Sequence, residues 1–215
     1  MQQVLLGQKE GMSQIYDDDG KSIPVTVVSS EDCVLVQKRT VQDQPSLQIG
    51  FDEIGENKVN KPMKGHFDAH GVSPRRVLQE FIVNDDSPLA ELDEGDRIGV
   101  DIFEEGDSID VKGKTKGRGF SGAVRRWGFG GGPMSHGGGM DRRTGSVGQS
   151  ADPSRIFPGK KMPGQYGNEI ETIQNLSVVR VFPEEDALFV SGSLPGPEGN
   201  TIILYNTQKG AKPVG

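Results

Sequence analysis

The feature of this sequence that most constrains its folding is an uneven distribution of charge and glycine. Residues 112–165 carry 11 Lys or Arg against 2 Asp or Glu, whereas the rest of the chain carries 13 against 29. The same segment contains 15 of the 31 glycines, and its large apolar residues are few and scattered. A segment with so little apolar surface cannot bury a hydrophobic core of its own. We therefore predict a globular part, residues 1–111 and 166–215, and a basic, Gly-rich extended arm, residues 112–165.

The flanking regions have the pattern of short β-strands. Runs that alternate or favour β-branched residues occupy residues 13–18, 21–30, 33–38, 46–51, 77–83, 97–103, 172–182, 186–192 and 200–206. Asp19-Gly20, between the first two runs, is a strong hairpin signal. Regularly spaced strands predict a mainly β fold with a closed or nearly closed antiparallel barrel. Residues 55–76 lack the alternation, so we expect an insertion there with at most one short helix around residues 61–69.

Within the arm, only one helix is expected. In SGAVRRW, residues 121–127, Ser121 is a plausible N-cap and Gly128 a C-terminal stop. The rest of the arm should be extended.

The arm combines cations with aromatic side chains in a way that favours RNA binding. Arg pairs stand at residues 125–126 and 142–143, and a Lys pair at 160–161 supplies further phosphate-binding groups. Phe120, Trp127 and other aromatic residues among them can stack on bases. Ordering such a segment costs on the order of 50 kcal/mol of backbone entropy. We therefore expect a large folded RNA, rather than a short oligonucleotide, as the partner.

Two other functions fit parts of the pattern. Residues 117–122, GRGFSG, match the dinucleotide fingerprint G-x-G-x-x-G of a nucleotide-dependent enzyme. We reject this interpretation because the motif follows the charged tract KGKTK instead of a buried strand, and because Asp141 lies in a Gly-rich loop and not in a following strand. The second alternative, a protein-binding β-barrel module with a disordered Gly-rich linker, stays open.

No residue pattern indicates catalysis or metal binding. His66 and His70 are four residues apart, but the zinc-protease motif requires Glu where Phe67 stands, so structural or surface histidines are expected. Cys33, beside an apolar run, is interpreted as a buried strand residue, and a single cysteine allows no internal disulfide. The sequence also lacks an apolar run long enough for a membrane helix or a secretory signal. We expect a soluble, cytoplasmic protein that is not an enzyme and has no cofactor, metal, membrane or small-molecule substrate.

Longer motifs resemble one protein family. These are GRGFSGAVRRWGF (117–129), SHGG (135–138), GSVGQSADPSRIFPGKKMPGQYGNE (145–169) and IQNLSVVRV (173–181). The opening GQKEGMSQIYDDDGKSIPVTVV (7–28) and the tract NKPMKGHFDAHGVSPRRVLQEF (60–81) are similar to the same family. The sequence thus resembles bacterial ribosomal protein L3, of the large subunit, over nearly its whole length.

The resemblance implies a translation-protein-type β-barrel with a long loop that enters 23S ribosomal RNA toward the peptidyl transferase centre. It also implies a role in early subunit assembly and contacts with the large-subunit proteins numbered fourteen and nineteen. The loop tip corresponds to residues 145–152. The implied RNA-binding residues are Lys114, Lys116, Arg118, Arg125, Arg126, Trp127, His136, Arg142, Arg143, Gly145, Ser146, Gln149, Ser150, Arg155, Lys160 and Lys161.

The sequence departs from the family pattern in two respects that affect function. The position that carries a methylated glutamine in some relatives is Ala151 here, although Gln149 lies close by. Family members are usually basic, whereas this chain has a formal net charge of −7. Because carboxylate repulsion is screened at about 1 M salt, where the Debye length is about 3 Å, an acidic barrel suggests adaptation to a salty cytoplasm.

Overall fold

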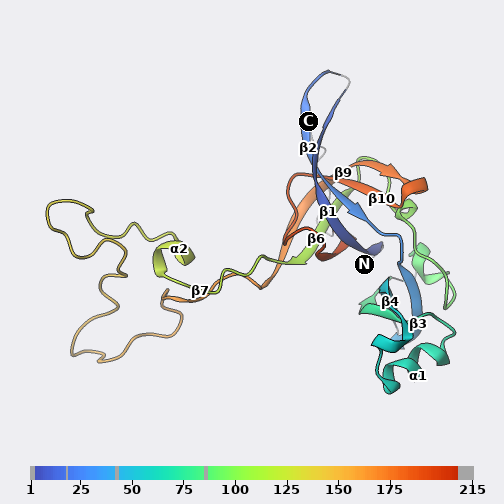
Figure 1. Ribbon diagram of the computed structural model, residues 1–215, viewed down its shortest axis with the longest axis horizontal. Helices are drawn as coiled ribbons and strands as arrows, with labels where there is room; N and C mark the ends of the chain where they lie inside the picture. Colours follow the sequence, from blue (N-terminus) through green and yellow to red (C-terminus); the bar gives the residue numbers. More distant parts are fainter. Residues whose placement is uncertain (1–2, 18, 42–43, 85–86, 208–215) are drawn as a thin grey trace. The chain divides into compact units, whose positions relative to one another are not determined.

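The computed structural model describes residues 3–17, 19–41, 44–84 and 87–207, which form two compact units (Figure 1). One unit comprises Met1–Lys114 and Ile170–Gly215, and the other comprises Thr115–Glu169. Strand β6 (Ser108–Lys114) belongs to the first unit. Lys112 and Lys114, which the charge count assigned to the arm, therefore lie in a strand of the globular unit.

The globular unit is built on a closed barrel of six antiparallel strands, which confirms the predicted fold class. The strands follow the order β1-β11-β6-β9-β10-β2 around the barrel. Besides β6 they are β1 (Val4–Tyr16), β2 (Ser22–Ser29), β9 (Ile170–Phe182), β10 (Ala187–Ser191) and β11 (Thr201–Asn206). The predicted run at residues 13–18 is the end of the longer β1, except that residue 18 lies outside the described residues.

The hairpin expected at Asp19-Gly20 is present between β1 and β2. The carboxylate of Asp17 accepts hydrogen bonds from the backbone N–H groups of Asp19 at 3.1 Å and Lys21 at 2.9 Å. Gly20 has φ +78°, a conformation that glycine adopts without steric cost.

Three of the predicted strands do not join the barrel. They are β3 (Val34–Val41), β4 (Gln44–Glu53) and β5 (Arg75–Ile82), which form a separate sheet in the order β3-β4-β5. Leu35 packs in the main core, whereas Val34 and Val36, on the opposite face of β3, pack with Phe67 of a helix. Both faces of the sheet are covered at β3, so its apolar residues form a continuous run without alternation. Such a run predicts a buried strand but does not indicate which sheet the strand joins.

The strand predicted at residues 97–103 is wrong. This segment contains only a short 3-10 helix, η3 (Val100–Ile102), and Arg97 makes an isolated bridge to Val34. Ile98, Val100 and Phe103 are all buried in the core. Their spacing of two and then three residues does not match the period of a strand, so the segment fills the core without a ladder.

The insertion contains the helix that was expected, α1 (Lys61–Ala69). Asn60 caps it by accepting a hydrogen bond from the backbone N–H of Met63 at 3.0 Å, and Pro62 occupies its first turn. Short 3-10 helices occur at η1 (Glu56–Lys58), η2 (Pro88–Ala90) and η4 (Pro183–Glu185).

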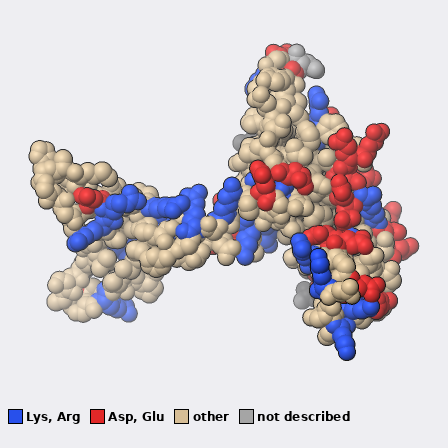
Figure 2. Space-filling model, in the orientation of Figure 1, with Lys and Arg blue, Asp and Glu red and all other residues tan. Residues whose placement is uncertain are grey.

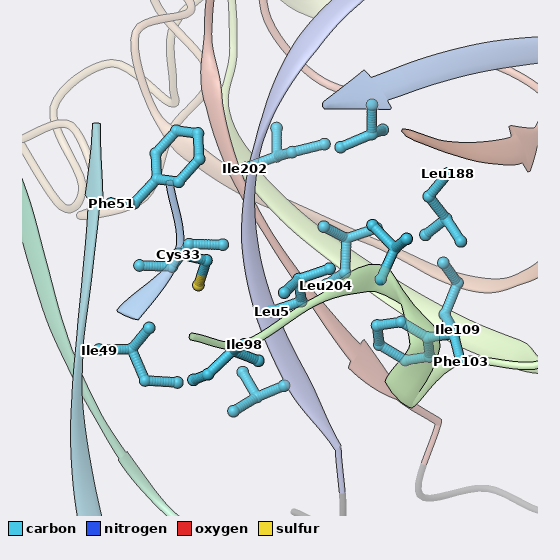
Figure 3. Packing of buried hydrophobic residues seen from close by; sticks show 14 of the residues in the cluster. Leu5, Cys33, Ile49, Phe51, Ile98, Phe103, Ile109, Leu188, Ile202 and Leu204 are labelled. Carbon is cyan, nitrogen blue, oxygen red and sulfur yellow. The ribbon is translucent and has the colours of Figure 1, made fainter. Parts of the chain in front are cut away.

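One continuous core joins the barrel to the three-stranded sheet (Figure 3). Leu5, Leu188 and Leu204 come from barrel strands, whereas Ile49 and Phe51 come from β4. All five are buried, and they belong to one cluster of contacting apolar side chains. The globular unit therefore folds around apolar residues that lie entirely outside residues 115–169.

Candidate nucleic-acid interface

Two legs of the Thr115–Glu169 unit run side by side and form its stem. The backbone N–H of Thr115 donates to the carbonyl of Glu169 at 2.8 Å, and that of Arg118 donates to Tyr166 at 2.9 Å. Farther along, β7 (Phe120–Ser121) pairs with β8 (Gly164–Gln165). The paired legs hold the ends of the unit together, so that the cations on both legs lie in a fixed register.

Gly167 allows the close approach of the two legs. Its φ is +67°, and an added Cβ would lie 2.0 Å from the carbonyl oxygen of Lys116. No side chain fits at this distance, because real Cβ atoms do not approach backbone oxygen so closely.

The predicted helix follows the stem as α2 (Ala123–Trp127). Gly128 ends it in the left-handed conformation, as expected, with φ +72°. The predicted cap at Ser121 is wrong: the N-cap is Gly122, and the Ser121 hydroxyl is directed to the Arg118 carbonyl at 3.4 Å. Ser121 is buried in the β7 strand, and this pairing removes it from the helix start.

Trp127 is the centre of a cluster of cations at the end of α2. The guanidinium carbon of Arg126 lies 4.8 Å from the centroid of the indole ring, and the Lys161 ammonium lies 5.5 Å from it. The indole Nε1–H donates to the carbonyl of Met162 at 2.9 Å, and Arg126 Nη1 donates to the same oxygen at 3.0 Å. These two bonds hold the Arg126 guanidinium and the indole ring on the same carbonyl.

Two further cations lie over aromatic rings in this unit. Arg118 lies 5.1 Å from the ring centroid of Tyr166, and Arg155 lies 5.6 Å from that of Phe157. Within the described parts of the chain, every cation–aromatic pair belongs to Thr115–Glu169. Such pairs present a positive charge beside a flat surface, which suits both phosphates and bases.

Beyond the stem, the unit consists of loops held by backbone contacts. The N–H of Gly132 donates to the carbonyl of Asp141 at 3.2 Å. At the tip, the Ser146 hydroxyl donates to the Gly148 carbonyl at 3.0 Å, and residues 145–150 and 154–156 border an open hollow of about 480 Å³.

The predicted RNA-binding residues are almost all accessible. Of the sixteen, only Arg126 is half-buried, and only Lys114 lies in the globular unit. The Thr115–Glu169 unit carries nine Lys or Arg against three Asp or Glu, and Figure 2 shows the Lys and Arg side chains gathered on its surface. Phe120, Met134 and Phe157 are more than half exposed, whereas Ala123 alone among its apolar residues is buried. These positions agree with an RNA interface, but contact with RNA at each residue stays a prediction.

Tyr166 and Met162 belong to this surface and are not among the sixteen predicted RNA-binding residues. Tyr166 supports Arg118, and the Met162 carbonyl orients both Arg126 and Trp127. A search for aromatic residues near the cations could have found Tyr166. The role of Met162 is carried by its backbone, which no residue pattern reveals.

The residues considered for other chemistry have ordinary partners. His66 Nε2 lies 2.7 Å from Gln48 Oε1, and His70 Nδ1 lies 2.7 Å from Glu94 Oε2. Among the residues described, no group of three or more His, Cys, Asp or Glu side chains is arranged to hold a metal ion. In the same residues, no helix has the length and apolar character needed to cross a bilayer.

The glycine motif at residues 117–122 follows a strand that the sequence did not indicate. A strand, β6, does precede the motif and ends at Lys114, where the sequence indicated only a charged tract. This strand is antiparallel to both of its neighbours in a barrel, and α2 has only five residues. A dinucleotide site requires a parallel βαβ unit with a longer helix, so the motif still does not fit one.

Comparison with known proteins gives one consistent family. Residues 92–207 match the family of ribosomal protein L3. The large ribosomal subunit protein uL3 of Thermosipho africanus is 48% identical over 209 residues, which cover 96% of this chain and 99% of that protein. The proteins of the same name from Thermotoga petrophila and Thermotoga sp. strain RQ2 are each 46% identical over 207 residues, with 95% of this chain and 97% of theirs covered.

Proposed function

The chain belongs to the ribosomal protein L3 family, and from this premise we propose that it binds the RNA of the large ribosomal subunit through Thr115–Glu169. The family consists of ribosomal proteins, so the chain is a structural component of the large subunit and not an enzyme. Two expectations from the sequence are thereby confirmed: the chain is a structural protein of the large ribosomal subunit, and it is not an enzyme. The identity of the RNA, the place of the loop and the neighbouring proteins are parts of the proposal.

The observation that carries the proposal is the surface chemistry of the Thr115–Glu169 unit. Nine cations lie on a unit with almost no buried apolar side chains, and four of them are held over aromatic rings. Cationic side chains bind phosphates, and exposed aromatic rings stack on unpaired bases. A protein surface of this kind is stabilised when it is enclosed by nucleic acid.

The extended form of this unit indicates that it enters folded RNA instead of lying on its surface. Its legs and loops expose most of the predicted residues, including Arg142 and Arg143 on one loop and Arg155 near the tip. By resemblance, the partner is 23S ribosomal RNA, the tip at residues 145–152 approaches the peptidyl transferase centre, and binding helps early assembly. The neighbours are the large-subunit proteins numbered fourteen and nineteen. In this function the protein organises RNA and performs no chemical step.

The paired legs of the stem favour RNA binding over the alternative of a protein-binding module with a disordered linker. A disordered linker needs no paired legs, whereas here the stem hydrogen bonds and the Trp127 cluster fix specific geometry. Gly167 is also placed where no other residue fits.

The test is a substitution of four arginines by alanine, Arg125→Ala, Arg126→Ala, Arg142→Ala and Arg143→Ala, of which Arg126 is half-buried and the other three are exposed. Each phosphate contact contributes about 0.7 to 0.9 to the slope of log K against log salt. If all four side chains contact phosphates, the slope measured with 23S ribosomal RNA falls by about 3, and affinity falls at low salt.

The matched control removes four cations from the globular unit, Lys21→Ala, Arg39→Ala, Lys58→Ala and Arg180→Ala. All four are exposed, so the control changes net charge equally. It should leave the salt slope within about one unit of the parent value. Equal slopes for the parent protein and the arginine variant would refute phosphate binding by these side chains.

A further inference from the structure

Trp127 is accessible, but its surroundings differ from those of an aromatic ring that stacks on bases. It is 40% exposed, compared with 81% for Phe120 in the same unit. Arg126 and Lys161 both lie over the indole ring, whereas no cation of the described chain lies over Phe120. The polar group of the indole, Nε1–H, already donates to the Met162 carbonyl. The ring and its N–H are therefore engaged by groups of the protein itself.

The two cations come from opposite legs of the unit. Arg126 belongs to α2, which follows β7, and Lys161 lies shortly before β8, the strand that pairs with β7. Both lie near one ring centroid, at 4.8 Å and 5.5 Å, so their charges are no farther apart than the sum of these distances. The fold thus brings together two positive charges from distant parts of the sequence.

Neither of these charges is neutralised within the described chain. Every ion pair between described residues lies in the globular unit. Arg126 donates from Nη1 to the Met162 carbonyl, and among those residues its guanidinium makes no other hydrogen bond and the Lys161 ammonium makes none. Two like charges held close together repel each other, and an anion that contacts both removes this repulsion. The remaining donors of both side chains are available to such an anion.

We propose that Arg126 and Lys161 together bind one phosphate of the RNA backbone, and that Trp127 is a positioning residue that holds both cations for this contact. The inference rests on the proposed function, since the phosphate belongs to the RNA that the unit binds. Guanidinium and ammonium groups donate charge-assisted hydrogen bonds of about 2.7–2.9 Å to phosphate oxygens.

The role of Trp127 follows from the groups that it contacts. The negative face of the indole ring attracts both cations, and the Met162 carbonyl joins the ring and the Arg126 guanidinium to the returning leg. Trp127 therefore acts through two phosphate-binding side chains, and stacking on bases is left to rings without a cation, such as Phe120.

The test measures binding of the full chain to 23S ribosomal RNA over a range of salt concentrations, with Trp127→Leu and Trp127→Phe. Each phosphate contact contributes about 0.7 to 0.9 to the slope of log K against log salt, whereas stacking on a base releases no counterions. Trp127→Leu should lower the slope by this amount and weaken binding at low salt. Trp127→Phe keeps an aromatic face for the cations and should keep the parent slope. An unchanged slope in Trp127→Leu would overturn the inference.

The matched control is Phe120→Leu, which removes an exposed aromatic ring that holds no cation. It should weaken binding without changing the salt slope. An equal fall of the slope in Phe120→Leu and Trp127→Leu would contradict a specific role of Trp127 in phosphate binding.

A coupling experiment asks whether Trp127 acts through the two cations. In a chain that already carries Arg126→Met and Lys161→Met, adding Trp127→Leu should cause no further loss of affinity, because no cation remains to be held. A further loss as large as that in the parent chain would show direct contact between the ring and RNA, against the inference.

A measurement on the unsubstituted protein is possible because Trp127 is the only tryptophan of the chain. Stacking on a base quenches indole fluorescence, whereas a phosphate bound by neighbouring cations does not cover the ring. We expect Trp127 to keep most of its emission when 23S ribosomal RNA is bound. Loss of most of the emission would overturn the inference.

The outcome for the proposed function is read separately. Arg142→Ala with Arg143→Ala should lower the salt slope whatever Trp127 does, since these arginines lie outside the Trp127 cluster. If this pair lowers the slope and Trp127→Leu does not, RNA binding by the unit stands and only the positioning role is wrong.

Discussion

At the scale of single residues, burial decides what Cys33 can do. Its side chain is fully buried in the main core, next to β3. Burial raises the pKa of the thiol to about 12, and a backbone hydrogen bond from Leu6 and the charge of Arg75 only partly oppose this. The thiol therefore stays protonated and unreactive at neutral pH, which agrees with the interpretation of Cys33 as a structural residue.

This pKa predicts a pH dependence of stability. In the unfolded chain the thiol ionises near its ordinary pKa of about 8.5. Between this value and about 12 the folded state holds a proton that the unfolded state has lost, so the free energy of unfolding falls as pH rises. The Cys33 contribution should approach about 1.4 kcal/mol per pH unit.

Urea unfolding of the parent protein and of Cys33→Ala between pH 8 and 10.5 measures this contribution. The variant should lose less stability over the range, whatever its stability at pH 8. Parallel curves for the two proteins would show that the thiol does not cause the dependence.

At the scale of elements, the stem of the Thr115–Glu169 unit is determined by its backbone. Its legs meet through main-chain hydrogen bonds, and its one short helix is fixed by the Met162 carbonyl, which accepts from Arg126 and Trp127. Gly164 instead leaves room for a side chain, because its added Cβ would lie 2.5 Å from Nη1 at the flexible end of Arg126. The two legs thus come close together because Gly167 has no side chain, and not because apolar side chains pack between them.

Gly167→Ala should open the stem and leave the barrel intact. The variant combines a clash with the Lys116 carbonyl and a left-handed φ that costs about 1 kcal/mol for alanine. Hydrogen exchange at the Arg118 and Tyr166 amides, which pair across the legs, should accelerate at least tenfold.

Gly122→Ala is the control for this prediction, since the added Cβ would meet no atom within 4 Å and φ is −67°. Its exchange rates should match those of the parent protein. Unchanged rates in Gly167→Ala would mean that the close approach of the legs does not limit their stability.

At the scale of the whole molecule, the buried core and the predicted RNA-binding residues are divided between the two units. The main core lies wholly in the globular unit, whereas most of the predicted RNA-binding residues lie in Thr115–Glu169. The two connections between the units leave from Lys114 and Ile170, which are direct partners across β6 and β9. The pairing of β6 with β9 therefore ends at the residues where the Thr115–Glu169 unit begins.

Replacing Thr115–Glu169 by an Asn-Gly turn should give a folded barrel. A two-residue turn of this type joins adjacent antiparallel strands, and the deletion removes almost no apolar core. Thermal unfolding should stay cooperative, and affinity for 23S ribosomal RNA should fall at least a hundredfold. A deletion variant that binds this RNA like the parent would contradict RNA binding through Thr115–Glu169.

The acidic globular unit predicts a stabilising effect of salt. Outside residues 112–165 the chain has 29 acidic against 13 basic residues, and repulsion among these carboxylates is screened as ionic strength rises. We expect the melting temperature of the free protein to rise by several degrees between 0.05 and 1 M KCl. A constant or falling melting temperature would contradict the proposed adaptation to a salty cytoplasm.

The sequence alone determined the features that depend on local composition and period. Alternating apolar residues indicated β2, β9, β10, β11 and the end of β1, but neither β6 nor the beginning of β1. Asp19-Gly20 indicated the hairpin, and Gly128 indicated the end of α2. The charge and glycine count also located a segment without a core, because a deficit of apolar side chains cannot be corrected by folding. Long motifs identified the family, which the comparisons confirm.

Only the tertiary structure decided which segments of the chain pair or pack with one another. The separation of β3, β4 and β5 from the barrel, the irregular path of residues 97–103 and the assignment of Lys114 to β6 depend on packing between distant segments. The same holds for the Met162 carbonyl beside Trp127. Each of these features depends on contacts between residues far apart in the chain. Such contacts form because they lower the free energy of the whole fold, and they leave no pattern in the local sequence.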